Sequence, residues 1–284
     1  MSQPAVRPGF SQALPWMLCA GALIWLYGPT CLAMARVWAD DPNYSHGFLV
    51  PLISAWLLWR DRQELARLAA GPDWRGLTLV IAALLVYLLG RLGHELFLQR
   101  ASMVMLLWGL AVLLWGWPLA RRAAFAIWYL LLMIPWPYVL YDSLAFPLRL
   151  LAAELAGGAL RLLGLPVLVE GNVIHLPNIV LNVVDACSGI RGLVSLLAAG
   201  LIVGRLMLPG FWRRLILALL ALPAAVLTNA ARITLAGVLA ERLGPQTLDG
   251  LMHDAVGWLV FMSAFGLLCL AAWLLARPGR RAAP

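Results

Sequence analysis

Long apolar runs separated by short polar segments dominate the chain and predict a polytopic membrane protein. A helix needs about 20 apolar residues to cross a bilayer, and about eight runs approach this length. The second run is short for a full crossing unless it tilts or extends back to Tyr44. The expected spans are residues 14–35, 46–59, 76–93, 101–118, 123–141, 189–208, 214–238 and 255–276. We therefore expect an all-α polytopic membrane protein with about eight transmembrane helices.

The segment between the fifth and sixth expected spans has a different pattern. Residues 143–164 scatter one glutamate and two arginines among leucines and alanines, which favours an amphipathic helix in the membrane interface. A tilted or re-entrant segment is the alternative. In residues 165–184 valines alternate with other side chains until Pro177-Asn178 interrupts them. This alternation predicts a short β-hairpin on the outer surface, with its turn at Pro177-Asn178, directly before the sixth span.

Charge is sparse and one-sided. The chain is 63% hydrophobic and only 12% charged, with a net charge of +8, and every basic residue is an arginine. These arginines lie mostly at span ends and, with the N-terminus in the cytoplasm, mostly on the inner side, which indicates retained cytoplasmic loops rather than nucleic-acid binding. The first run lacks a small-residue cleavage site, so we expect a retained helix. The expected organisation is a cytoplasmic segment 1–13, a single transmembrane domain 14–276 and a cytoplasmic Arg-rich tail 277–284.

One cysteine differs from the others. Three lie inside apolar runs, where a thiol usually behaves as a small hydrophobe: Cys19, Cys31 and Cys269. Cys187 instead stands in the polar cluster 185–191, and Ser188-Gly189 after it suits the start of a helix. A helix N-terminus lowers the pKa of a thiol from about 8.5, so Cys187 is either a nucleophile at the outer membrane surface or an inert cysteine at a loop–helix junction. No Cys/His spacing predicts a metal site, and no cofactor is expected.

An arginine in the seventh span is the second candidate. Arg232 follows Asn229 by three residues, so the two share one helix face. A guanidinium near hydrocarbon is costly unless it meets an anion or water, and in a dry site it can stabilise a developing oxyanion. The alternatives are an arginine that snorkels to the interface or one that pairs structurally with Asp185 or Asp249.

The histidines supply the third candidate. His253 begins the eighth span on the expected outer side, four residues after Asp249. An imidazole there can take a proton from a thiol and give it to a leaving amine, although a histidine at a span end is otherwise an interfacial polar residue. His46 and His94, also on the expected outer side, compete for the role of base, and His175 in the expected hairpin is the weakest candidate.

These motifs, in this order, resemble the exosortase/archaeosortase family of polytopic membrane cysteine transpeptidases. The family pattern matches Ala186-Cys187-Ser188-Gly189, then Asn229-Ala230-Ala231-Arg232, then His253. Two further stretches look like the bacterial exosortase A branch: Tyr44-Ser45-His46-Gly47-Phe48-Leu49-Val50-Pro51 and Glu170-Gly171-Asn172-Val173-Ile174-His175-Leu176-Pro177. The similarity runs from about residue 40 to about residue 260.

The resemblance implies a function. Family members are thought to cleave exported proteins that end in a Pro-Glu-Pro motif, a transmembrane helix and a basic tail, together called a PEP-CTERM signal. The cut end is thought to pass to a lipid or polysaccharide acceptor linked to exopolysaccharide production. The resemblance implies that Cys187 attacks the scissile carbonyl to form a thioester, that Arg232 stabilises the oxyanion or aligns the substrate, and that His253 acts as acid and base.

The resemblance also implies a location, and two other functions fit the same residues. The implied protein is a multi-pass protein of the bacterial inner membrane, in contact with the lipid bilayer, with its active site on the periplasmic face and no nucleic-acid partner. A membrane acyltransferase would instead carry an acyl group on Cys187 and cleave no peptide. A non-enzymatic component of exopolysaccharide assembly would use Arg232 to guide an anionic lipid and would tolerate replacement of Cys187.

Overall fold

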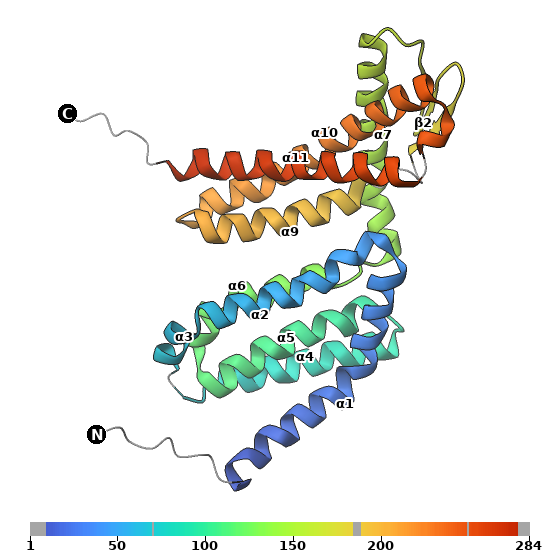
Figure 1. Ribbon diagram of the computed structural model, residues 1–284. Helices are drawn as coiled ribbons and strands as arrows, with labels where there is room; N and C mark the ends of the chain where they lie inside the picture. The colour runs from blue at the N-terminus through green and yellow to red at the C-terminus, as the bar shows by residue number, and fades with distance from the viewer. Residues whose placement is uncertain (1–9, 70, 184–188, 249, 278–284) are drawn as a thin grey trace, which may run out of the picture. The chain divides into compact units, whose positions relative to one another are not determined.

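The computed structural model describes residues 10–69, 71–183, 189–248 and 250–277 (Figure 1). For residues 10–16, 18, 189–191, 245, 248 and 250–254 it describes the backbone alone. Helices make up 84% of the structure, which confirms the predicted all-α class. The chain divides into two compact units, Met1–Pro135 and Trp136–Pro284.

The first unit is built from helices of very different lengths. The longer ones are α1 (Phe10–Asp40), α4 (Arg75–Leu92) and α5 (Leu96–Trp115). The shorter ones are η1 (Pro42–Phe48), α2 (Leu49–Arg60), α3 (Arg62–Leu68), α6 (Trp117–Tyr129) and η2 (Leu130–Met133). The helices α4 and α5 lie against each other along most of their length, and α2 packs on α6 (Figure 1).

Small residues let α4 and α5 approach until their backbones touch. A Cβ added at Gly76 would overlap the backbone of Leu113, and one added at Gly109 would lie 2.9 Å from the nitrogen of Val80. Because lipid tails are as apolar as the side chains they replace, helix association in a membrane depends on this kind of close packing.

We expect Gly76→Ala to lower the thermal midpoint of the detergent-solubilised protein, because its methyl group would overlap the α5 backbone rather than a movable side chain. Overpacking of this kind costs about 1–3 kcal/mol. The matched control is Gly21→Ala on α1, where a Cβ meets nothing within 4 Å, so its midpoint should equal or slightly exceed that of the parent. Equal midpoints for the two variants in circular-dichroism melts would contradict this packing.

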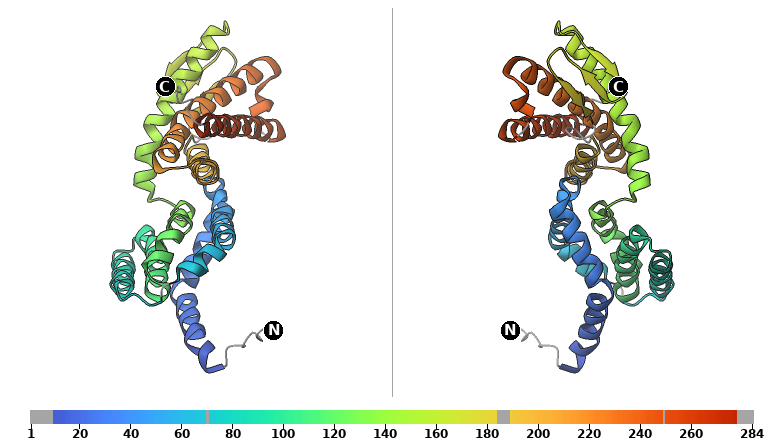
Figure 2. Two further views of the ribbon diagram at one scale, coloured as in Figure 1. Left: turned by 90° about the vertical axis from the view of Figure 1, so that its left-hand side faces the viewer. Right: turned by 90° about the vertical axis from the view of Figure 1, so that its right-hand side faces the viewer.

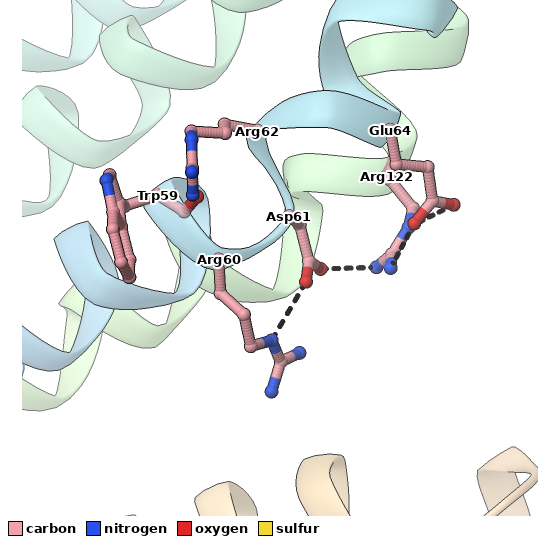
Figure 3. A network of polar contacts seen from close by, with 6 residues as sticks. All are labelled: Trp59, Arg60, Asp61, Arg62, Glu64 and Arg122. Carbon is pink, nitrogen blue, oxygen red and sulfur yellow. Dashed lines mark hydrogen bonds and ion pairs between the residues drawn. The ribbon is translucent and has the colours of Figure 1, made fainter.

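An ion-pair network ties the junction between α2 and α3 to α6 (Figure 3). Arg122 of α6 donates to both oxygens of Glu64, at 2.7 and 2.6 Å, and lies 2.9 Å from Asp61. Asp61 also accepts a hydrogen bond of 2.9 Å from Arg60. The hydrogen bond to Glu64 is the main reason why the pKa of Arg122 is raised, and a bidentate pair of this kind fixes geometry as well as charge.

The second unit is organised around one long helix, α10 (Phe211–Leu243). Its first half packs with α9 (Gly189–Met207) and α11 (Gly250–Ala276), around residues such as Leu217, Ala225 and Leu268. Its second half, with Ile233 and Ala240, packs with α7 (Tyr138–Leu162) and a small sheet. A short 3-10 helix, η3 (Pro245–Leu248), links α10 to α11. Figure 2 shows the sheet lying beside the C-terminal half of α7.

The sheet confirms the expected hairpin and adds a strand to it. Strands β1 (Leu168–Glu170), β2 (Val173–His175) and β3 (Val180–Asn182) form an antiparallel meander, and the expected turn at Pro177-Asn178 joins β2 to β3. The unexpected first turn is Gly171-Asn172, where Gly171 adopts φ +62. A Gly-Asn pair between two alternating runs is a recognised hairpin signal, so the sequence contained this turn.

The long helices confirm the multi-pass prediction. Among the described residues, six helical segments are long and apolar enough to cross a membrane, and Gly192–Met207 is a shorter apolar helix. The six are Cys19–Asp40, Arg75–Leu92, Leu96–Trp115, Tyr138–Leu162, Phe211–Leu243 and Ala255–Ala276.

Three expected segments have different bounds in the structure. The second expected span, 46–59, starts as the 3-10 helix η1 and becomes an α-helix only at Leu49. The fifth, 123–141, was wrong as one helix: α6 ends at Tyr129, and Ile134 is extended because Pro135 follows it. Residues 143–164, expected in the interface, belong to α7, whose length and composition fit a membrane span.

Candidate active site

Arg232 lies on the side of α10 that faces α11. Its guanidinium packs against Gly257: a Cβ added there would be 3.1 Å from Nη2, 3.2 Å from Cζ and 3.4 Å from Nε. The side chain is half-buried, and Ile233 beside it is in the core formed with α7 and the sheet. The sequence-predicted arginine is therefore held between helices and not displayed on an outer surface.

The helix that follows Cys187, α9, packs along α10 in the direction of Arg232. Along the antiparallel pair of α9 and α10, Gly204 lies against Arg214, and Gly200 lies nearest to Leu217. One turn from its start, α9 shares a shallow pocket with α10, lined by Leu148, Leu193, Ala225, Val226 and Asn229. Continuing this progression brings Gly189, the first residue of α9, to the level of Arg232. Cys187 itself lies outside the described residues, as does Asp185.

The start of α11 belongs to the same neighbourhood. Gly257, Phe261, Ala264 and Leu268 form a stripe at helical spacing, and its apolar members pack in the core with α9 and α10. Position 253 extends this stripe by one turn beyond Gly257, within α11. The side chain of His253 and the whole of Asp249 are outside the described residues. The backbone thus places position 253 one turn from the residue that Arg232 contacts.

Polar side chains near Arg232 on α10 are mostly engaged with their own helix. Thr228 donates to the carbonyl of Ala224 at 2.6 Å, and Thr234 donates to that of Ala230 at 2.8 Å. Asn229 is one of the residues around the small apolar pocket shared by α7, α9 and α10.

The competing histidines have other surroundings. His46 in η1 hydrogen-bonds through Nε2 to the carbonyl of Leu132, at 3.1 Å, and so links η1 to η2. His94 is exposed in the turn between α4 and α5, with φ 54. Both belong to the first unit. His175 of β2 lies 3.3 Å from Glu170 of the neighbouring strand, which gives it a structural partner.

The environment of His46 predicts a pH-dependent stability. Burial lowers the pKa of His46, although hydrogen bonds to backbone carbonyls oppose the shift. The unfolded chain then binds a proton at a higher pH than the folded one does. The contribution of neutral His46 to the stability of the folded protein is therefore complete above about pH 6.5 and is lost as the pH falls. We expect the thermal midpoint to drop between pH 7.5 and pH 5.5. The drop should be smaller in His46→Gln, which keeps an N–H donor; an equal drop in both proteins would contradict it.

Gly257 is the residue at this site that sequence reasoning missed. A single glycine inside an apolar helix is a weak signal, and its only sequence hint is the spacing of four residues from His253. Its contact with Arg232 joins residues 25 positions apart, so it appears only once α10 and α11 are packed together.

The comparisons with known proteins bear on the chain as a whole. The family model for transmembrane exosortases matches residues 38–270, a stretch that includes Cys187, Arg232, His253 and Gly257. No curated protein and no solved structure matches the chain significantly. The match covers most of the chain and agrees with its membrane-spanning helices. The chain therefore belongs to the transmembrane exosortase family.

Proposed function

We propose that the chain is a membrane-embedded cysteine transpeptidase that cleaves a C-terminal sorting signal from exported proteins. One observation supports this most: Arg232 lies against α11 one turn from position 253. The packing of α9 along α10 also runs toward this level at the start of α9, two residues after Cys187. A thiol, an imidazole and a guanidinium from these three places are the groups that acyl transfer through a thioester requires.

The proposed reaction has two halves. The sulfur of Cys187 attacks the scissile carbonyl carbon, and its proton passes to His253. Arg232 stabilises the oxyanion of the tetrahedral intermediate. The C–N bond then breaks, His253 gives its proton to the leaving amine, and a thioester remains on Cys187. An acceptor nucleophile, or water, attacks the thioester; His253 takes the attacker's proton and returns it to the departing thiolate.

The proposed substrate carries a Pro-Glu-Pro motif, a transmembrane helix and a basic tail, and the proposed acceptor is a lipid or a polysaccharide. The transmembrane helix of such a substrate would hold the motif at a fixed depth beside the enzyme's own helices. This placement replaces a bimolecular encounter by an intramembrane one and so raises the effective concentration of the motif at the site. We place the site on the periplasmic face of the bacterial inner membrane, because the expected outer ends of the spans carry Cys187 and His253.

Co-expression with reporters tests this function. One reporter ends in Pro-Glu-Pro, a transmembrane helix and an arginine-rich tail; its control has alanines in place of Pro-Glu-Pro. We expect a shortened product from the first reporter alone, and only when the chain is present. If neither reporter is shortened and Cys187 retains labelled fatty acid, the acyltransferase alternative is correct instead.

A further inference from the structure

The guanidinium of Arg232 meets α11 through its flat face. A carbon added at Gly257 would be almost equally far from Nη2, Cζ and Nε, at 3.1, 3.2 and 3.4 Å. An approach along the edge of the group would leave Cζ clearly farther away than the two nitrogens, so the added carbon stands over the plane. A contact with the face occupies none of the in-plane N–H donors.

This close approach is particular to Arg232. The three atoms nearest to a Cβ at Gly257 all belong to the Arg232 side chain, and none belongs to the α10 backbone. Farther along the same stripe, α11 packs through residues that carry side chains, Phe261, Ala264 and Leu268. Gly266 of the same helix would meet nothing within 4 Å. The space at Gly257 is therefore filled by the guanidinium and is not a general requirement of helix packing.

We propose that Gly257 is a positioning residue for Arg232. Because Gly257 lacks a side chain, the guanidinium lies flat against α11 one turn from position 253. In this position its N–H donors keep the directions that a developing oxyanion needs. A methyl group at Gly257 lifts the guanidinium from this position by a few tenths of an ångström. The proposal rests on the proposed function, since it assigns Gly257 a part in the same reaction.

Gly257→Ala and Gly266→Ala form a matched pair on one helix. Alanine favours a helix over glycine at both sites, but only Gly257→Ala displaces Arg232. A misplacement of about 1 Å in a catalytic group costs about 10²-fold, so we expect Gly257→Ala to lower kcat for reporter cleavage by about tenfold with KM unchanged. Gly266→Ala should stay within about twofold of the parent. Parental kcat in Gly257→Ala overturns the proposal.

A double-mutant cycle separates positioning from a structural effect. In the Arg232→Lys background the planar guanidinium is gone, so adding Gly257→Ala should cost much less than tenfold. The same fold-loss in both backgrounds overturns the proposal. If Gly257→Ala alone fails to accumulate in the membrane, restored accumulation in the double variant supports the clash with Arg232, and continued failure overturns it.

The proposed function can fail separately. If Arg232→Ala is inactive while Gly257→Ala cleaves normally, the positioning role is wrong and the proposed function stands. If Arg232→Ala retains parental activity, both are wrong.

Discussion

Replacing Cys187 with alanine is expected to reduce reporter cleavage by at least about 10³-fold, to the background level, because the proposed thioester forms on its sulfur. The variant should still insert and accumulate, since the change removes one sulfur and leaves the helices of the second unit intact. The measurement is the initial rate of reporter shortening in proteoliposomes that contain equal amounts of enzyme.

The other cysteines are the controls for this result. Cys269 is part-buried in the core shared by α9, α10 and α11, in the same unit as the proposed site. Cys19 and Cys31 lie on α1 in the first unit. Alanine at any of these three should change the rate by no more than a few fold, through packing alone. Parental activity in Cys187→Ala, or an equal loss in Cys269→Ala, would show that the thiol is not the nucleophile.

Replacing Arg232 with alanine is expected to lower kcat by about 10²–10³-fold, the usual cost of removing one donor to an oxyanion. The half-buried guanidinium lies between α10 and α11, where its interactions are stronger than in bulk water. Lysine keeps the charge but lacks the flat fork that packs on Gly257, so Arg232→Lys should fall between the parent and alanine.

Arg242→Ala is the matched control for this prediction. Arg242 is an exposed arginine in the last turn of the same helix. Its loss removes an equal charge from the protein and should leave kcat within about twofold of the parent. Similar losses in Arg232→Ala and Arg242→Ala would mean that net charge, rather than a placed guanidinium, controls the rate.

The all-α class and the order of the motifs could be predicted from the sequence because they depend on local patterns. Apolar length alone predicts that residues such as Arg75–Leu92 cross the membrane. The turn at Pro177-Asn178 follows from residues that cannot continue a strand. Arg232 stands out because a charge in an apolar helix needs a reason.

Features that depend on contacts between distant segments could not be predicted in this way. The packing of Arg232 on Gly257 requires α10 and α11 to lie side by side, and the spacing of either residue along the chain does not reveal it. The same holds for Gly76, whose contact with Leu113 needs the pair of α4 and α5. The end of α6 at Tyr129 is different: Pro135 and Pro137 were visible signals, and the apolar residues around them concealed the break.

The mass of the peptide that carries Cys187 tests the central claim most directly. Proteoliposomes cleaving the Pro-Glu-Pro reporter would be quenched in acid during turnover, digested and analysed by mass spectrometry. The proposed reaction predicts a fraction of this peptide joined through a thioester to the new C-terminus of the shortened reporter, released by neutral hydroxylamine and absent from the alanine-motif control. Steady accumulation of shortened reporter with Cys187 unmodified throughout turnover, and continued cleavage by Cys187→Ala, would contradict it.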